Sequence, residues 1–329
     1  MSKKLGSMDL GHGWIKLMVD GTIWRQPSVV GEARQLFEDN IQPTDVIYRG
    51  IKDDEAVDYF VGDLALRHSK IRYAATAEEK AKNWTTKVLL DAALGVNAPN
   101  DDLYLVTGLP VDAYFKQKPQ LEGLLTTFSY DDPYEIQVGK EATLARPIIE
   151  EFKIVPQPFG SAMNYLLDDK GILIDKEAAT KKIIVVDIGY YTLDILTLDA
   201  MQIGKESNSP EGLGADTAYK LIQDYLKDAI GKAPGRYDLD RYVRAGVYED
   251  IDIKPLTAKA FEALAAQIDL EIKQHNTNYY KYIITGGWAP EIAKTLTTPK
   301  DRTVVMDQLG NVQGYGKIGA RTWGKKLDR

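Results

Sequence analysis

Two segments of the chain share a pattern of residues that could bind phosphate. Each has an aspartate, a glycine two positions later and a polar or charged residue seven positions after the aspartate. The segments read Asp9-Leu10-Gly11-His12-Gly13-Trp14-Ile15-Lys16 and Asp187-Ile188-Gly189-Tyr190-Tyr191-Thr192-Leu193-Asp194. Glycine lets backbone N–H groups approach phosphate oxygens, and Lys16 adds a positive charge. The sequence therefore predicts two phosphate-binding turns, one in each half of the chain.

The aspartates that open these segments are candidate metal ligands. Asp9 and Asp187 each end an apolar run typical of a buried strand, where an unpaired carboxylate is costly to desolvate. A hydrated Mg²⁺ between them would account for both, because Mg²⁺ favours a few carboxylates together with waters and phosphates. An ordinary hairpin turn is the alternative for either segment alone. The repetition with matching flanks favours the phosphate hypothesis.

Gln157 is the candidate for positioning a water molecule. It follows Pro156 at the expected start of a helix, where its amide could orient a water for attack on a terminal phosphate. A glutamine at a helix end without any chemical role is the alternative.

Glycines and acids in the second half are candidates for binding the nucleoside. Glu211 and Asp216 flank Gly212 and Gly214 at the start of an expected helix and could meet ribose hydroxyls. Acids at a helix N-terminus also stabilise the helix itself, so capping is the alternative. Gly286-Gly287 follows an apolar strand and could let a base or ribose lie against the backbone.

The elements expected around these residues occur in the same order in both halves. Strands are expected at residues 5–10, 14–19, 22–26, 103–107, 182–186, 192–198, 201–206 and 282–285. Helices are expected at residues 77–94, 114–125, 158–167, 215–229, 257–275 and 312–326. Asp20-Gly21 predicts a type I′ hairpin turn, and residues 235–255 are expected to form a small peripheral insertion.

The composition excludes several classes of function. The 329 residues are enough for two domains with separate cores, and 44% hydrophobic and 27% charged residues are ordinary for a globular protein. No apolar run has the length of a membrane span and no apolar signal-peptide core is present, so we expect a cytoplasmic protein without membrane contact. The absence of cysteine excludes disulfides and thiolate chemistry. A net charge of -7 without a basic block argues against direct nucleic-acid binding.

These motifs resemble those of the actin-like ATPase superfamily, and within it the plasmid-segregation ParM/StbA proteins and the archaeal actin-like proteins. The segments that begin at Asp9 and Asp187 resemble the two phosphate loops of that superfamily. Residues 156–162 resemble the first connection between its domains, residues 310–320 the second and residues 283–287 its adenosine motif.

The resemblance implies an α/β fold of the actin-like, ribonuclease H-like duplicated type, with a nucleotide cleft between two domains. Domain I is expected at 1–160, with an inserted subdomain at about 31–75, and is completed by a C-terminal helix at 312–329. Domain II is expected at 161–311, with an inserted subdomain at about 215–275. Gly316, Gly319 and Ala320 share one helix face and would let the two connecting helices cross closely.

The resemblance also implies roles for particular residues. Asp9 and Asp187 would act on Mg²⁺ and the attacking water, and Gln157 would position that water. The residues expected to contact ATP or ADP are Gly11, His12, Gly13, Lys16, Gly189, Tyr190, Tyr191, Thr192, Asp194, Glu211, Gly212, Gly214, Asp216, Gly286, Gly287 and Trp288.

The function implied by the resemblance is an ATPase that hydrolyses Mg-ATP, or GTP, and polymerises head-to-tail into dynamic filaments. Such filaments would segregate plasmids or other DNA through an adaptor protein bound to centromere-like DNA. Two alternatives stay open: a phosphotransferase of the sugar- or acetate-kinase type, and a scaffold that nucleotide locks without turnover. A Rossmann oxidoreductase is disfavoured because no G-x-G-x-x-G motif follows the first strand.

Overall fold

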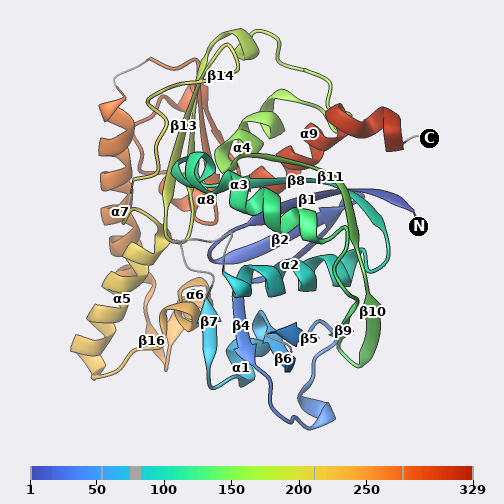
Figure 1. The fold of residues 1–329 in the computed structure, drawn as a ribbon. Coiled ribbons are helices and arrows are strands. Elements are labelled where there is room, and N and C mark those ends of the chain that lie inside the picture. Colours follow the sequence, from blue (N-terminus) through green and yellow to red (C-terminus); the bar gives the residue numbers. More distant parts are fainter. Residues whose placement is uncertain (1, 53–54, 75–82, 211, 276–277, 328–329) are drawn as a thin grey trace.

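The two halves of the chain build the same sheet twice. The computed structural model describes residues 2–52, 55–74, 83–210, 212–275 and 278–327. Its N-terminal sheet has the strand order β3-β2-β1-β8-β11, and its C-terminal sheet has the order β14-β13-β12-β17-β18 (Figure 1). Each sheet combines an antiparallel three-stranded meander with two strands that run parallel to the first. The repeated order predicted from the sequence is therefore confirmed.

The central strands are buried on both faces, which explains their nearly continuous apolar sequences. The N-terminal sheet consists of β1 Lys3–Leu10, β2 Trp14–Val19, β3 Thr22–Pro27, β8 Asp102–Leu109 and β11 Ile148–Pro156. The C-terminal sheet consists of β12 Lys182–Ile188, β13 Leu193–Asp199, β14 Gln202–Ile203, β17 Lys281–Gly286 and β18 Thr303–Val305. The strand expected at 201–206 is shorter because Ala200 and Met201 form a turn with φ values of 47° and 68°.

A third, antiparallel sheet lies beside the N-terminal sheet and has the order β10-β9-β5-β6-β4-β7. Its strands are β4 Val29–Glu32, β5 Val46–Lys52, β6 Glu55–Val61, β7 Arg72–Ala74, β9 Tyr134–Val138 and β10 Glu141–Ala145. Because β9 pairs with β5, this sheet draws on residues beyond the insertion expected at about 31–75. The domain boundaries given above stay a prediction.

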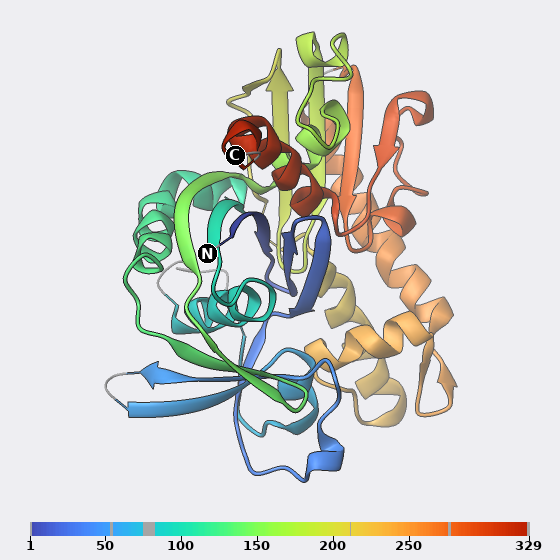
Figure 2. The same ribbon diagram turned by 90° about the vertical axis from the view of Figure 1, so that its right-hand side faces the viewer.

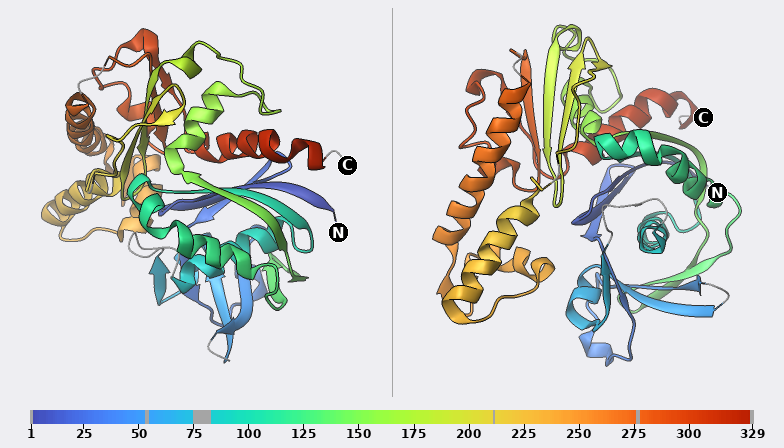
Figure 3. Two further views of the ribbon diagram at one scale, coloured as in Figure 1. Left: turned by 45° about the horizontal axis from the view of Figure 1, so that its top comes forward. Right: turned by 60° about the vertical axis from the view of Figure 1, so that its left-hand side comes forward.

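Helix α2 (Trp84–Asn97) packs between the N-terminal sheet and this third sheet (Figure 3). It begins later than the predicted residue 77, because Asn83 is its N-cap and accepts the N–H of Thr85 at 3.1 Å. Residues 77–82 lie outside the described part of the chain.

The remaining helices cover the sheets or connect them. Their bounds are α1 Asp63–His68, α3 Val111–Thr127, α4 Gln157–Leu166, α5 Ala215–Ile230, α6 Arg236–Ala245, α7 Lys254–Gln274, α8 Ala289–Ile292 and α9 Gly310–Leu327. Helices α5 and α7 cover the outer face of the C-terminal sheet, and a small hairpin, β15 Val247–Tyr248 with β16 Ile251–Asp252, follows α6 (Figures 1 and 3). Among the described residues no helix is long and apolar enough to cross a membrane.

Helices α4 and α9 cross between the two repeated sheets and carry the chain from one to the other (Figure 2). The crossing is close because Gly314 lies on Gly160, and a Cβ on Gly314 would overlap the Gly160 carbonyl oxygen. The prediction that Gly316 and Gly319 form the crossing is wrong. These two glycines lie against Met18 and Leu5 of the N-terminal sheet, because α9 packs on that sheet with a different face.

Candidate functional site

Each repeated sheet presents an aspartate at the end of its first strand, opposite the residue seven positions later. The register pairs Asp9 with Lys16 across the β1–β2 hairpin, and Asp187 with Asp194 across the β12–β13 hairpin. The spacing shared by the two sequence segments is therefore the spacing of directly opposite residues. Opposite side chains lie on the same face of a sheet, so the seventh residue sets the charge beside each aspartate.

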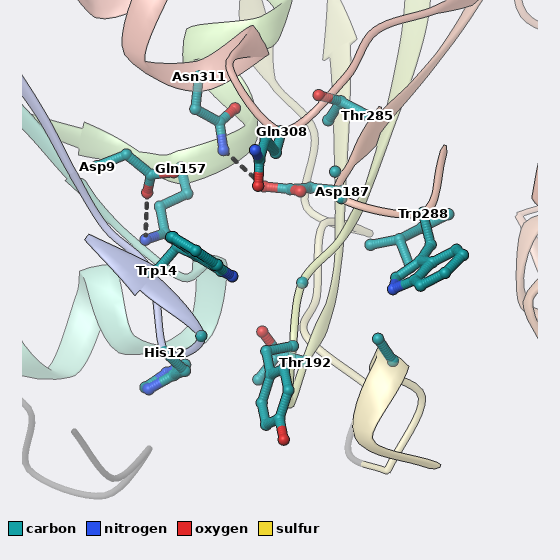
Figure 4. Close-up of a pocket in the computed structure, with 18 of the residues that line it drawn as sticks. Asp9, His12, Trp14, Gln157, Asp187, Thr192, Thr285, Trp288, Gln308 and Asn311 are labelled. Carbon is teal, nitrogen blue, oxygen red and sulfur yellow. Dashed lines mark hydrogen bonds between the residues drawn. The ribbon is translucent and has the colours of Figure 1, made fainter. Parts of the chain in front are cut away.

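In the first hairpin, a lysine and a glutamine hold Asp9. Lys16 Nζ lies 2.7 Å from Asp9 Oδ2, and both side chains are buried. Gln157 Nε2 donates to Asp9 Oδ1 at 3.3 Å (Figure 4). Helix α4 starts directly after β11 and thereby brings Gln157 to the end of β1, with Pro158 in the first turn where a missing N–H is tolerated.

In the second hairpin, Asp187 lies next to another acid instead of a base. Burial, together with the nearby carboxylates of Asp194 and Asp9, raises the pKa of Asp187 to about 7. Asn311 opposes this rise, because its Nδ2 donates to Asp187 Oδ2 at 2.6 Å (Figure 4). In the absence of a bound cation, few neighbouring groups therefore stabilise the ionised form of this buried carboxyl group.

The carboxylate of Asp194 accepts hydrogen bonds from both halves of the chain. It accepts the N–H of Val111 at 2.9 Å and the hydroxyls of Thr192, at 3.0 Å, and Ser209. Val111 is the first residue of α3, a helix whose N-cap residue Pro110 makes no side-chain cap. Asp194 thus caps a helix that packs on the opposite sheet, which joins the two halves beside the second phosphate-type turn.

The two turns contact each other through the tyrosines of the second turn. A Cβ on Gly13 would lie 3.0 Å from Tyr190 Cβ, so the glycine makes room for this side chain. Tyr191 meets the ring of His12 edge-on with ring centroids 5.8 Å apart, and its hydroxyl lies 2.8 Å from that of Tyr237. Tyr190 stacks on Tyr237 with centroids 5.5 Å apart. The predicted loop residues are therefore brought together around α6.

Helix α6 lies at the mouth of the cavity between the halves, so the prediction that residues 235–255 form a peripheral insertion is wrong for this helix. Tyr237 packs against the apolar cluster that includes Phe60 and Leu64 of the first half. Asp238 lies 3.3 Å from Arg72 Nη1 of β7. The position of α6 depends on contacts between segments that are far apart in the sequence. The local sequence pattern therefore does not reveal it.

The far end of the cavity has glycines on one wall and an arginine on another. Gly286 has a φ of 116°, and a Cβ there would overlap the Ile188 carbonyl oxygen. A Cβ on Gly287 would be 3.9 Å from Arg244 Nη2, an ordinary van der Waals contact. The Arg244 guanidinium lies 4.9 Å from the centroid of the Trp288 ring and its Nε donates to Asp240 at 2.8 Å.

One cavity collects most of the predicted site residues. Those that line it are Asp9, Gly11, His12, Gly13, Lys16, Gln157, Asp187, Gly189, Tyr190, Thr192, Asp194, Gly286, Gly287 and Trp288. The cavity lining does not include Tyr191, Gly212, Gly214 and Asp216. Gly214 packs instead on the backbone of Tyr190 and Tyr191, the N–H of Asp216 donates to the Tyr190 carbonyl at 2.8 Å, and Glu211 lies outside the described residues.

The sequence analysis missed several residues of this cavity. They are Trp14, Ile188, Ala215, Tyr219, Asp240, Arg244, Thr285, Gln308 and Asn311. Asn311 had one available signal, because it stands near the start of the helix after the second connection, as Gln157 does after the first. Trp14, Ile188 and Thr285 lie within the motifs quoted above but receive no role there. The others carry no local pattern that distinguishes them from ordinary helix and strand residues.

The donor set of the cavity fits Mg²⁺. Asp9 and Asp187 reach it from different halves of the chain (Figure 4). Within the described residues, no group of three or more His, Asp or Glu side chains could hold a metal ion alone. Two carboxylates suffice for Mg²⁺ when phosphate oxygens and waters complete its octahedron. The pair fits a cation that arrives together with a phosphate ligand.

Comparisons with known proteins agree with this architecture. Residues 7–160 match the family described as "Actin like proteins N terminal domain". A ParM filament structure from Clostridium botulinum aligns with a TM-score of 0.78 at 22% identity, covering 98% of this chain and 100% of that chain. The pCBH ParM non-polymerisable quadruple mutant aligns with a TM-score of 0.76 at 23% identity, covering 99% and 100%.

An archaeal actin homolog in complex with ADP aligns with a TM-score of 0.75 at 17% identity, covering 99% of this chain and 100% of that chain. No curated protein sequence matches the chain. The N-terminal residues 7–160 thus match an actin-like family model, and the whole chain shares the fold of the ParM and archaeal actin-homolog structures.

Proposed function

We propose that this actin-like protein binds and hydrolyses a nucleoside triphosphate, ATP or GTP, with Mg²⁺ in the cavity between its halves. The observation that carries the proposal is the convergence of Asp9 and Asp187, from two hairpins of identical register, and of Gln157, from α4, on one cavity. The ADP complex of an archaeal actin homolog with this fold supports a nucleotide as the ligand.

The hairpin end of the cavity binds the phosphates. Lys16 is held at the end of β2 with its ammonium group 2.7 Å from Asp9, where it meets incoming phosphate charge. Asp9 and Asp187 would hold Mg²⁺, which when bound would stabilise the negative charge of the transferring phosphoryl group. Gln157 donates a hydrogen bond to the carboxylate of Asp9 and orients the attacking water.

The other end of the cavity binds the nucleoside. The backbone of Gly286-Gly287 forms one wall of this end, and the guanidinium of Arg244 lies beside it. A planar base that lies along this wall can stack on the Arg244 guanidinium, because a guanidinium stacks on aromatic faces. Asp240 holds Arg244 through its Nε and lines the same cavity, within reach of ribose hydroxyls.

A comparison of two aspartates in one hairpin tests the hydrolysis. Asp187→Ala should lower the rate of phosphate release from Mg-ATP or Mg-GTP by at least about 100-fold. Asp199→Ala is the matched control, because Asp199 lies exposed at the opposite end of β13. It should retain the activity of the unsubstituted protein. Equal phosphate release by the Asp187→Ala and Asp199→Ala variants would contradict the proposal.

The protein assembles head-to-tail with further copies of itself into filaments. Large apolar side chains are exposed at both ends of the molecule: Ile51 in β5 is 71% exposed, and Ile203 in β14 is 39% exposed (Figure 1). Contacts between opposite ends repeat without closing and yield an open filament. The ParM filament structure with this fold supports such assembly.

Sedimentation with Mg-ATP tests the assembly. Ile51→Glu places a charge at one proposed contact and should raise the protein concentration needed for pelleting by about tenfold or more. Leu270→Glu is the control, since Leu270 is 61% exposed but belongs to the outer helix α7. Equal pelleting of both variants and the unsubstituted protein would remove Ile51 from the interface.

The filaments serve plasmid or other DNA segregation through an adaptor protein bound to centromere-like DNA. A net charge of -7 without a basic block favours an indirect connection to DNA over direct contact. Co-sedimentation of filaments with labelled DNA tests this, and DNA should pellet only when the adaptor is added. DNA that pellets with filaments alone would contradict the indirect connection.

A further inference from the structure

The two helices that connect the halves each deliver one side-chain amide to one carboxylate of the cavity. Helix α4 begins with Gln157, whose Nε2 donates to Asp9 Oδ1 at 3.3 Å. Helix α9 carries Asn311 in its first turn, and Asn311 Nδ2 donates to Asp187 Oδ2 at 2.6 Å. Figure 4 shows the two amides approaching from separate helices toward separate aspartates. Asn311 thus occupies, in the second half, the place that Gln157 has in the first.

The orientation of the Asn311 amide is determined by Ser161 of α4. Ser161 Oγ donates to Asn311 Oδ1 at 2.7 Å, and the Ser161 N–H donates to the same oxygen at 3.3 Å. With two donors on its oxygen, the amide must turn its NH₂ group toward Asp187. All three side chains are buried, so water does not compete with these hydrogen bonds.

This chain of hydrogen bonds passes through the point where the two helices cross. Ser161 directly follows Gly160, on which Gly314 of α9 lies without room for a Cβ. Ser161 Oγ also lies 3.1 Å from Thr285 Oγ1 of β17. A rotation of α9 against α4 would therefore change the distance between Ser161 and Asn311, and with it the hold on Asp187.

We infer that Asn311 is a positioning residue that fixes the Asp187 carboxylate for hydrolysis and links its orientation to the crossing of α4 and α9. The inference rests on the proposed function, because it assigns Asp187 to hydrolysis. Asn311 itself acts through Asp187. Opening or closing of the two halves turns the connecting helices, so Asn311 transmits the domain angle to the candidate site.

The structure also offers a matched control in the same helix interface. Asn164 of α4 donates through Nδ2 to Gln313 Oε1 of α9 at 3.0 Å. It resembles Asn311 in residue type and in bridging α4 to α9, and it does not line the cavity. Asn164→Ala reports the effect of a lost asparagine on the helix crossing alone.

Kinetics and nucleotide affinity provide the first test. Asn311→Ala should lower kcat for phosphate release by about 10- to 100-fold, as for other residues that orient a metal-binding carboxylate. Its nucleotide Kd should stay within about threefold, because a residue acting on the reacting state alone changes kcat more than binding. Asn164→Ala should leave kcat within about twofold. Equal kcat values for the Asn311→Ala variant and the unsubstituted protein would overturn the inference.

A residue exchange provides a second test, whose stability readout needs no nucleotide. Asn311→Asp places a carboxylate against Asp187 and should lower the thermal unfolding midpoint. The double variant Asn311→Asp with Asp187→Asn restores a donor and an acceptor with their positions exchanged, so its midpoint should rise again. Phosphate release should stay low in the double variant, because position 187 then lacks a carboxylate.

The outcomes separate the inference from the proposed function. A double variant that is no more stable than Asn311→Asp alone would overturn the direct Asn311–Asp187 pairing. Failure of the proposed function has a different signature, since the unsubstituted protein then releases no phosphate, whatever the exchange does to stability.

Discussion

Asp187 and Asp194 lie directly opposite each other across the β12–β13 hairpin, but their carboxylates have different partners. Asp194 accepts the Val111 N–H at the start of α3 and the hydroxyl of Ser209. Asp187 accepts the amide of Asn311. One acid therefore joins the two halves of the protein, while the other belongs to the candidate site. Substitutions at the two positions should have opposite effects on stability.

Asp187→Asn should stabilise the nucleotide-free protein. Burial raises the pKa of Asp187 from 3.8 to about 7, so folding favours the protonated form. The folded state is then most stable relative to the unfolded state below pH 3.8, and this contribution is lost as the pH rises through about 7. At pH 8 the variant should gain on the order of a few kcal/mol in unfolding free energy.

Urea unfolding without nucleotide at pH 5 and pH 8 measures this effect. The gain in unfolding free energy from Asp187→Asn should be smaller at pH 5, where Asp187 keeps its proton in the folded unsubstituted protein. A variant that is less stable than the unsubstituted protein at pH 8 would show that the ionised Asp187 is compensated by its surroundings.

Asp194→Ala should destabilise the protein, because it leaves the buried Val111 N–H and Ser209 hydroxyl without their acceptor. The expected loss in unfolding free energy is about 2–4 kcal/mol. Asp194→Asn retains one acceptor oxygen and should lose less unfolding free energy than Asp194→Ala. Hydrogen exchange at the Val111 amide gives the local readout, and unchanged protection there in Asp194→Ala would contradict the cap.

Alanine substitutions at the two adjacent glycines should have different consequences. Gly286→Ala should destabilise folding by more than about 2 kcal/mol, because its φ is 116° and a Cβ would overlap the Ile188 carbonyl. Gly287→Ala has room for a Cβ and should fold normally. If the base lies on Gly287, this second variant should bind nucleotide more weakly.

Thermal unfolding and nucleotide titration of both glycine variants distinguish these effects. Normal nucleotide affinity in a folded Gly287→Ala protein would show that the nucleoside lies elsewhere in the cavity.

Asp91 lies outside the candidate site and should make the stability of the protein depend on pH. Burial raises its pKa from 3.8 to about 6, although Lys87 Nζ lies 2.5 Å from Oδ1 and opposes the rise. Relative to Asp91→Asn, the unsubstituted protein should lose on the order of 2 kcal/mol of stability between pH 4 and pH 6.5. Urea unfolding across this range measures the difference. A difference that does not change with pH would contradict the raised pKa.

The hairpins of the site could be predicted because their signals are local. Asp20 and Gly21 have φ values of 47° and 83°, as the predicted type I′ turn requires. In the neighbouring β1–β2 hairpin, the spacing from Asp9 to Lys16 is that of directly opposite residues. Neighbouring residues contain this information, so one sequence is sufficient.

The rest of the site depends on contacts between distant segments. Arg244 reaches the cavity only because α6 packs against the first half through Tyr237. Gly316 and Gly319 form a plausible crossing face by spacing, but the observed contact uses Gly314, because the rotation of α9 is set by the sheet beneath it. Local patterns indicate that a helix has a small-residue face, but they do not choose its neighbour.

Following released phosphate and light scattering together, in one solution of the protein with Mg-ATP, tests the proposed function most directly. An actin-like ATPase that forms filaments should give scattering that rises above a threshold protein concentration, with phosphate released in parallel. Asp187→Ala should release no phosphate above background. Scattering that never rises over a wide range of protein concentration, together with background phosphate release, would contradict the proposed function.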